Sequence, residues 1–241
     1  MFIRGHDSSV CCHVSGIASV KDVVNSVRLV LGVLAVSAFA GDASLDGLLK
    51  GVETRYNRAN TLQVLFHEEY TPSGPGGGPA RRSESGRLML RKPGRMRWDY
   101  SQPKGKLFIS DGKFMWLYTP SGPSGHPRAE KMKLQESDDL RAPLAFLLGK
   151  LNFEKEFRNL RARPEGAGTR ITAEPKTANL PYSSVEFVVT AQNRIREVKV
   201  TGFDNSILDF IFDEENLDPP LDGKLFQFQA PPGAEVVEGG A

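Results

Sequence analysis

The sequence predicts a mainly β protein with helices, of the α+β class, folded as an antiparallel barrel or sandwich. Short runs with strand character recur at intervals of 8–12 residues with turn residues between them. Two other stretches carry apolar residues at helical spacing. Residues 86–120 show the strand pattern most clearly, because four runs are separated by breaks at Pro93-Gly94, 102–105 and Asp111-Gly112. This segment predicts a β-meander.

The Asp111-Gly112 break is the strongest hairpin signal in the chain. Glycine supplies the positive φ that a tight turn between two strands needs. In residues 95–100, before this break, side chains alternate between the two faces of the expected strand. One face is apolar and consists of Met96, Trp98 and Tyr100. The other is charged and consists of Arg95, Arg97 and Asp99.

Residues 113–119 differ, because large apolar side chains occupy both faces of the expected strand. Trp116 shares one face with Phe114 and Tyr118, whereas Met115 and Leu117 share the other. Both faces must therefore be covered. One covering is expected to be a core, and the other a helix or a ligand.

The first helix is expected just after residue 44, where Asp42 or Ser44 can cap its beginning. Its apolar residues fall at helical spacing, as Leu45, Leu48, Leu49, Val52 and Tyr56. The chain then returns to strands. Outside the meander these are expected at residues 61–70, 129–134, 153–160, 169–173, 183–190, 194–201, 207–212 and 225–229. Pro231-Pro232-Gly233 should end the ordered part, before a frayed tail from residue 235.

A second, leucine-rich helix is expected between two β segments. Its apolar stripe consists of Leu140, Leu144, Leu147, Leu148 and Leu151. A short and very apolar helix needs a surface to lie on. The open mouth or concave face of the sheet is the expected place.

Residues 1–40 read as an N-terminal extension followed by a secretory signal peptide. A weakly basic start leads into a 12-residue apolar run at residues 29–40, which ends in the A-x-A cleavage signal Ala38-Phe39-Ala40. Cleavage is expected after Ala40, leaving residues 41–241 as a single domain. Cys11 and Cys12 lie upstream of that site, so the mature chain is expected to be soluble, without disulfides and without a lipid anchor.

Composition and motifs argue against several function classes. Charges nearly balance, with 31 basic and 29 acidic residues, and no strongly basic patch suggests nucleic acid as a partner. His67 and His126 are isolated, so no metal or other cofactor is expected. No nucleophile elbow, zinc-protease, P-loop or dinucleotide motif is present. We therefore expect no catalytic residues and no enzyme.

Several landmarks follow one another in a fixed order along the chain. They are a G-x-L-x-L segment running through Lys92-Pro93 to Trp98, an S-D-G-K-x-x-W-x-Y segment from Ser110 to Tyr118, Ala142-Pro143-Leu144, Pro175-Lys176, and F-x-F-x-x-P-x-G from Phe226 to Gly233. Each motif alone is weak. Together, from about residue 45 to 238, they resemble the LolA family of periplasmic carriers of outer-membrane lipoproteins.

The resemblance implies an incomplete antiparallel barrel of about 11 strands, closed by the N-terminal helix and a lid helix over a hydrophobic cavity. The cavity would hold the acyl chains of lipoproteins. The side chains expected to line it are Leu62, Phe66, Leu88, Leu90, Met96, Trp98, Trp116, Leu144, Leu147, Leu148, Phe210 and Phe212.

In the family, an arginine just before the proline of the first landmark holds the lid shut until cargo arrives. Lys92 occupies the matching position here, with Arg91 before it. Lysine lacks the planar five-donor fork of arginine. The latch is therefore expected at Lys92 or, in its place, at Arg91.

The implied route is from an inner-membrane ABC-type lipoprotein release complex to an outer-membrane receptor lipoprotein, carried by a periplasmic monomer. Two alternatives stay open. A related half-barrel could shuttle glycolipids or other lipids, or act as an envelope-stress sensor, because fold alone does not fix function. A lipid hydrolase of the envelope is the third reading, and each aromatic residue could also be ordinary core.

Overall fold

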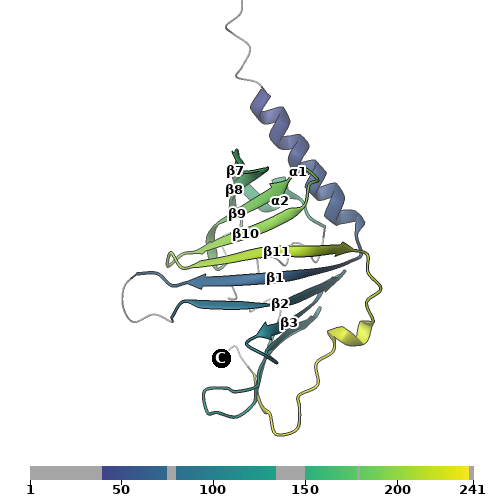
Figure 1. Ribbon diagram of the computed structural model, residues 1–241, viewed down its shortest axis with the longest axis vertical. Helices are drawn as coiled ribbons and strands as arrows, with labels where there is room; N and C mark the ends of the chain where they lie inside the picture. Colours follow the sequence, from purple (N-terminus) through teal and green to yellow (C-terminus); the bar gives the residue numbers. More distant parts are fainter. Residues whose placement is uncertain (1–39, 75–79, 134–149, 178–179, 239–241) are drawn as a thin grey trace, which may run out of the picture. The chain divides into compact units, whose positions relative to one another are not determined.

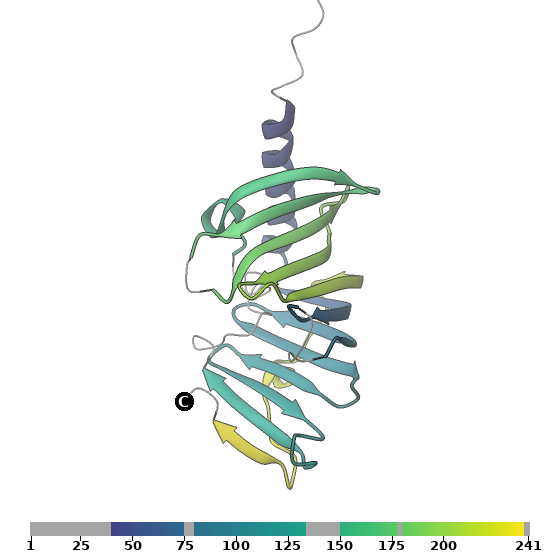
Figure 2. The same cartoon turned by 90° about the vertical axis from the view of Figure 1, so that its left-hand side faces the viewer.

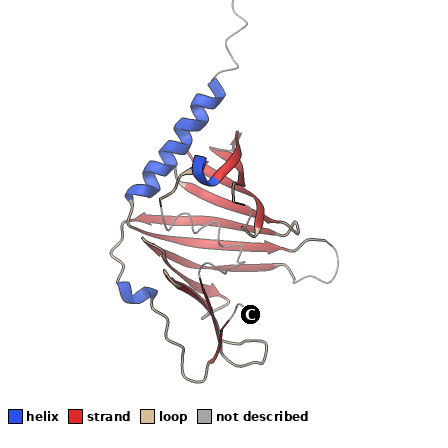
Figure 3. Ribbon diagram, turned by 180° about the vertical axis from the view of Figure 1, so that it is seen from behind, coloured by secondary structure: helices blue, strands red, loops and turns tan. Residues whose placement is uncertain are grey.

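The computed structural model describes residues 40–74, 80–133, 150–177 and 180–238. The chain forms two compact units, Met1–Asp42 and Ala43–Ala241, and the second unit contains the sheet. The described helices are α1 (Ala40–Arg58), α2 (Phe153–Glu156) and the 3₁₀ helix η3 (Gly223–Phe226), coloured blue in Figure 3.

The described strands form one twelve-stranded sheet in the order β12-β6-β5-β4-β3-β2-β1-β11-β10-β9-β8-β7 (Figures 1 and 2). Its strands are β1 (Thr61–Thr71), β2 (Arg82–Arg91), β3 (Arg95–Gln102), β4 (Leu107–Asp111), β5 (Phe114–Thr119), β6 (Arg128–Lys133), β7 (Phe157–Glu165), β8 (Gly168–Pro175), β9 (Tyr182–Thr190), β10 (Ile195–Gly202), β11 (Ile207–Leu217) and β12 (Glu235–Glu238). Neighbours pair antiparallel except β12 and β6. The sheet is open, with β12 and β7 at its edges, which confirms the incomplete antiparallel barrel.

The twelve strands described agree with the expected number of about 11. Some expectations about individual elements were wrong. Residues 153–160 begin with the one-turn helix α2, capped by the Asn152 side chain, before β7 starts at Phe157. Residues 235–238 form β12 instead of a frayed tail, because they pair with β6.

Helix α1 packs its predicted apolar stripe against the sheet. Leu49, Val52 and Tyr56 are buried and belong to the same core as the strands. They recur at i, i+3 and i+7, which places them on one face of a helix. Arg55 and Arg58 lie in the last turn, where positive charge is favourable next to the carbonyl end of the helix dipole.

The register brings alternate residues of the central strands onto one face, here called the inner face. Phe66 on β1 pairs with Phe212 on β11 and with Gly86 on β2, and Gly86 pairs with Tyr100 on β3. A Cβ atom at Gly86 would lie 2.1 Å from the main-chain oxygen of Asp99. Only glycine therefore allows β2 and β3 to approach this closely.

The opposite, outer face of β3 to β5 is covered by the segment after β11. Phe226 in η3 is fully buried, and the Phe228 ring lies 5.0 Å from that of Trp116. Arg97 Nη1 donates to the main-chain oxygen of Leu225 at 3.0 Å. This strap, residues 218–228, is the second covering that the apolar residues on both faces of β5 required. The strand expected at 225–229 is thus an error, because these residues cover the sheet instead of joining it.

The outer face of β8 to β11 carries charge instead of a strap. Arg170 is almost fully buried among the carboxylates of Glu165, Glu186 and Glu197, with Nη1 2.8 Å from Glu186 and Nη2 3.0 Å from Glu197. Lys199 Nζ lies 3.1 Å from Asp209 on β11. These contacts tie five neighbouring strands together on the face away from the core.

Candidate functional site

The inner face is a continuous apolar surface built from alternate residues of successive strands. Its centre is aromatic: the Trp98 ring lies 4.7 Å from Phe66 and 5.5 Å from Phe210. Phe210 in turn stacks on Phe212 at 6.0 Å, with an interplanar angle of 3°. Apolar and aromatic surface of this kind attracts hydrocarbon without directional preference.

The same surface continues across β10, β9 and β8. Phe187 on β9 meets the rings of Phe153 and Phe157 edge to face, at 5.4 and 5.7 Å. The other buried contributors from this half are Ile171, Ala173, Val185, Val189, Ile195, Val198, Val200 and Leu208. None of them was among the predicted lining residues. The alternation of apolar residues in the strands expected at residues 169–173, 183–190, 194–201 and 207–212 carried the signal that would have found them.

The structure brings most of the predicted lining residues together. Those on the inner face, all buried, are Leu62, Phe66, Leu88, Leu90, Met96, Trp98, Phe210 and Phe212. Trp116 is separated from them, because it lies on the outer face between Phe228 and Lys131, whose Nζ is 5.6 Å from its ring centroid. Leu144, Leu147 and Leu148 lie outside the described residues, as does most of the expected lid helix.

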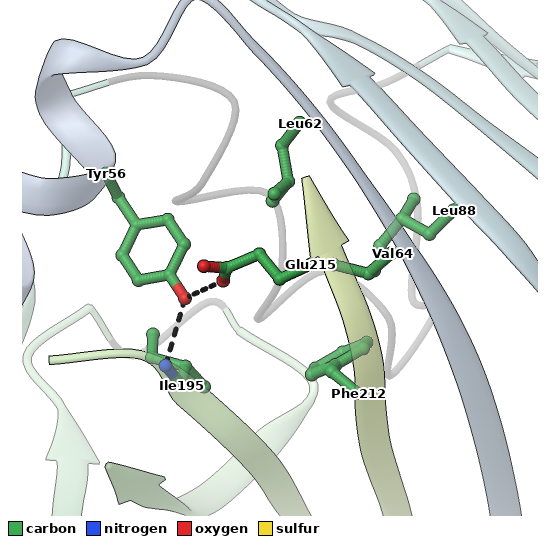
Figure 4. A pocket seen from close by; sticks show the side chains of 7 residues that line it. All are labelled: Tyr56, Leu62, Val64, Leu88, Ile195, Phe212 and Glu215. Atoms are coloured by element: carbon green, nitrogen blue, oxygen red, sulfur yellow. Dashed lines mark hydrogen bonds between the residues drawn. The ribbon is translucent and has the colours of Figure 1, made fainter. Parts of the chain in front are cut away.

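Helix α1 is fixed to the sheet by a buried polar cluster (Figure 4). The Tyr56 hydroxyl donates to Glu215 Oε2 at 2.5 Å and accepts the N–H of Ile195 at 2.9 Å. Arg55 Nε donates to the other oxygen of Glu215 at 3.0 Å. Burial raises the pKa of Tyr56 above its usual 10.0, and the charge of Glu215 raises it further. The phenol is therefore a protonated donor at neutral pH.

Two small hollows lie where the described part of α1 meets the sheet. One is lined by Tyr56, Leu62, Val64, Leu88, Ile195, Phe212 and Glu215, and its volume is about 10 Å³. A second of about 10 Å³ lies beside Ala59 and Lys92. Each has room for about one water molecule. An acyl chain does not fit either of these two hollows.

The two candidate latch residues have partners within the described chain. Lys92 Nζ donates to the main-chain oxygen of Tyr56 at 2.5 Å, one of the carbonyls left without a helical partner at the end of α1. Burial lowers the pKa of Lys92. Arg91 Nη1 donates to the main-chain oxygen of Leu221 in the strap at 3.1 Å. Here Lys92 holds α1 and Arg91 holds the strap.

Helix α1 also binds the segment at the end of the expected lid, where residues 150–152 are not helical. The Asn57 amide accepts the N–H of Leu151 at 2.7 Å and donates to the Leu151 carbonyl at 2.8 Å. Glu53 Oε1 accepts the N–H of Phe153 at 2.8 Å. Leu151 and Phe153 are fully buried. Residues 151–153 are therefore held in the core beside α1.

One cluster on the outer face contains the residue types of a serine hydrolase. His67 Nε2 lies 3.4 Å from Ser83 Oγ and also 3.4 Å from Glu69 Oε1. In a catalytic triad the nucleophile and the carboxylate bind different ring nitrogens. Here both approach the same nitrogen, and the His67 and Glu69 side chains are 44% and 64% exposed. The cluster does not have the geometry of a hydrolytic site.

The described residues define the class of protein to which the chain belongs. An open antiparallel sheet presents a continuous apolar inner face, with α1 packed across part of it. In this part of the chain no three His, Cys, Asp or Glu side chains gather in a way that could hold a metal ion. No helix described here is both long enough and apolar enough to span a bilayer. Such a face suits a protein that binds hydrocarbon chains.

The chain belongs to the LolA family. The family model described as "Outer membrane lipoprotein carrier protein LolA" matches residues 59–229, most of the sheet and the strap. This confirms the resemblance inferred from the ordered landmarks.

Relatives that carry the name outer-membrane lipoprotein carrier protein include the following two. The one from Chromobacterium violaceum is 24% identical over 217 residues, which is 90% of this chain and 97% of that protein. The one from Nitrosomonas europaea is 26% identical over 191 residues, 78% of this chain and 88% of that protein. Among solved structures, a LolA superfamily protein from Nitrosomonas europaea matches 76% of this chain and 97% of that chain, with 10% identity and a TM-score of 0.42.

Proposed function

We propose that this protein is a periplasmic carrier that covers the acyl chains of lipoproteins on their way to the outer membrane. Membership of the LolA family supports the proposal. The observation that carries it is the apolar inner face, with Trp98, Phe66 and Phe210 at its centre. No catalytic step is proposed.

The physical need for such a carrier is clear. Each CH₂ group exposed to water costs about 0.8 kcal/mol, so a lipoprotein with several acyl chains costs tens of kcal/mol to bring into water. An apolar face that accepts hydrocarbon without directional bonds tolerates chains of different length and shape. An empty carrier must also keep this face covered, since a large exposed apolar patch would cause aggregation.

The finer parts of the route are also proposed. Cargo would come from an inner-membrane ABC-type release complex and pass to an outer-membrane receptor lipoprotein, with the carrier acting as a monomer. Cleavage after Ala40 would deliver residues 41–241 to the periplasm. The lid role of Leu144, Leu147 and Leu148 and the latch role of Lys92 or Arg91 stay predictions.

Native mass spectrometry of the protein purified from periplasm tests the proposal. The expected result is a fraction with bound triacylated lipoprotein and a mature chain beginning at Gly41. Free phospholipid or glycolipid as the bound species would support a lipid shuttle instead. A protein that neither copurifies with acylated molecules nor binds a synthetic triacylated lipopeptide would end the carrier proposal.

A further inference from the structure

The inner face is apolar along most of β1 and β2 but charged at one end. Four successive inner-facing pairs join these strands: Leu62 with Leu90, Val64 with Leu88, Phe66 with Gly86, and Glu68 with Glu84. The first three pairs carry no charge, whereas the fourth sets two carboxylates directly opposite each other. Both glutamates are buried, at 3% and 9% exposure. This charged row lies near the end of β1 that is remote from α1 (Figure 1).

A lysine offsets the repulsion that two opposed acids would cause. Lys106 Nζ donates to Glu84 Oε2 at 2.5 Å, and both side chains are only 11% exposed. Lys106 comes directly before β4 and lies opposite Tyr100 on β3, whose N–H donates to the Lys106 carbonyl at 3.1 Å. The ion pair therefore reaches across β3 and joins the beginning of β4 to β2.

Aromatic rings connect the ion pair to the apolar part of the inner face. Lys106 Nζ lies 4.3 Å from the centroid of the Tyr100 ring, and that ring meets Phe66 edge to face at 5.2 Å. In the next row toward the end of β1, Arg82 lies 5.0 Å over the Tyr70 ring. Aliphatic, aromatic and charged groups thus follow one another along the face. This order matches an amphiphile, in which hydrocarbon ends at a polar group.

A gain in stability does not explain a buried ion pair here. Apolar residues of similar volume often stabilise a fold as well as a buried pair or better, because two charges must leave water. The pair does supply a chemical group that the rest of the apolar face lacks. A lysine ammonium carries three N–H donors, and a charged donor binds a carbonyl oxygen more strongly than a neutral donor does. Lys106 can therefore bind a carbonyl oxygen at the head of a hydrocarbon chain.

We propose that Lys106, held in place by Glu84 and Tyr100, binds the ester carbonyls at the head of the acylated cargo. The hydrocarbon would lie over Phe66 and the apolar rows toward α1, and the ester groups would lie beside the ammonium. This inference rests on the proposed carrier function. It states which way the ligand of that function lies and which chemical group at its head is recognised.

The charges in this row favour an uncharged head over a phosphate. The positive charge of Lys106 is already matched by Glu84, and Glu68 lies opposite Glu84 on β1. A phosphate brought to this row would meet two carboxylates, which repel it. An ester carbonyl has no net charge and needs only a donor. The site should therefore prefer acyl esters without phosphate, such as those of an acylated cysteine or a diacylglycerol, to phospholipids.

The first test uses the wild-type exported protein. Titrations compare ligands with the same acyl chains: a triacylated lipopeptide, its analogue with ether links in place of the glyceryl esters, and phosphatidylglycerol. The ester lipopeptide should bind at least tenfold more tightly than either of the others. Equal affinity for the ester and ether lipopeptides would overturn the site alone. An equally tight phosphatidylglycerol would overturn the preference for an uncharged head. A protein that binds neither lipopeptide would overturn the carrier proposal and the site together.

The second test removes the ion pair. Lys106→Met with Glu84→Gln removes both charges at once, so that neither is left buried alone. This variant should bind the ester lipopeptide at least tenfold more weakly than wild type and the ether analogue within twofold of wild type. An equal loss for both ligands would mean that the pair only supports the fold, and would overturn the site.

A matched control and a further ligand complete the design. Lys131→Met with Glu238→Gln removes a pair at 3.6 Å whose ammonium also lies on aromatic rings, Phe114 and Trp116, but on the outer face. This control should match wild type with both lipopeptides, and a loss of ester preference there would contradict the assignment to Lys106. Diacylglycerol carries the same esters without a peptide. If it binds as tightly as the lipopeptide, the site stands and the choice of lipoprotein as its ligand is overturned.

Discussion

The hydroxyl of Tyr56 on α1 and the carboxylate of Glu215 on β11 are 2.5 Å apart, and both side chains are buried. The same hydroxyl accepts the N–H of Ile195 on β10. One phenol oxygen therefore joins the helix to two strands, next to the apolar inner face. This contact fixes α1 at the place where Arg55 and Lys92 also bind, so it should control how firmly α1 covers the sheet.

Replacing Tyr56 with phenylalanine should destabilise the protein by about 1–3 kcal/mol at neutral pH. The ring stays buried, but the Ile195 N–H and one oxygen of Glu215 lose their partner, and unpaired buried polar groups are costly. Urea denaturation of residues 41–241 measures the change. Tyr118→Phe is the control, because the Tyr118 hydroxyl makes no hydrogen bond to a described residue, and it should change stability by less than about 0.5 kcal/mol. Equal stability of Tyr56→Phe and wild type would show that the cluster does not anchor α1.

Alkaline pH should destabilise the protein through its buried tyrosines. Burial raises the pKa of Tyr182 from 10.0 to about 12, and the pKa of Tyr56 is raised as well. A tyrosine whose pKa is higher in the folded state contributes stability that is fully present below pH 10, where the unfolded phenol is still protonated. That contribution is lost as pH rises from 10 through the folded-state value.

Unfolding free energies measured from pH 8 to pH 12 test whether stability falls above pH 10 as predicted. The decline above pH 10 should be smaller in Tyr182→Phe and in Tyr56→Phe than in wild type. A slope that both variants share with wild type would contradict the prediction.

The two tryptophans show what sequence patterns can and cannot predict here. Alternation correctly separated Met96, Trp98 and Tyr100 from their charged neighbours, because a strand's period of two depends only on local geometry. It also placed Trp116 opposite Met115. It could not say which of these faces is the inner one, because that depends on the strap, which follows about a hundred residues later and places Phe228 against Trp116.

The strand wrongly expected at residues 225–229, within the strap, is a second case in which alternation alone was not enough. Phe226 and Phe228 alternate with polar residues as in a strand, but alternation reports that one side is buried, and not that the backbone pairs with a neighbour. Contacts such as Tyr56 with Glu215 or Asn57 with Leu151 join residues 159 and 94 positions apart. No local pattern encodes them. Composition, periodicity and turn residues therefore predicted most elements and much of the apolar face, but not the polar contacts that hold α1.

Acyl-chain binding should be sensed by Trp98 and not by Trp116. The chain has two tryptophans, so Trp116→Phe leaves Trp98 as the single emitter and Trp98→Phe leaves Trp116. A brominated acyl chain quenches tryptophan only at close range. The probe should strongly quench the fluorescence of Trp116→Phe, which retains Trp98. The fluorescence of Trp98→Phe should change little, because its remaining Trp116 lies on the outer face against Phe228. Comparable quenching in both variants would mean that hydrocarbon reaches the strap side of the sheet.

Lys92→Met should weaken the attachment of α1 and leave acyl-chain affinity within about twofold of wild type. The ammonium group binds the Tyr56 carbonyl at the negative end of the helix dipole, and removing a charged hydrogen bond of this kind costs about 1.5–3 kcal/mol. Arg91→Met is the matched control, because it removes the neighbouring cation, which binds the strap instead of α1. Urea denaturation and titration with a fluorescent triacylated lipopeptide measure the two effects separately. If Lys92 were the lid latch instead, Lys92→Met would change lipopeptide affinity several-fold while Arg91→Met would not, and stability would change little.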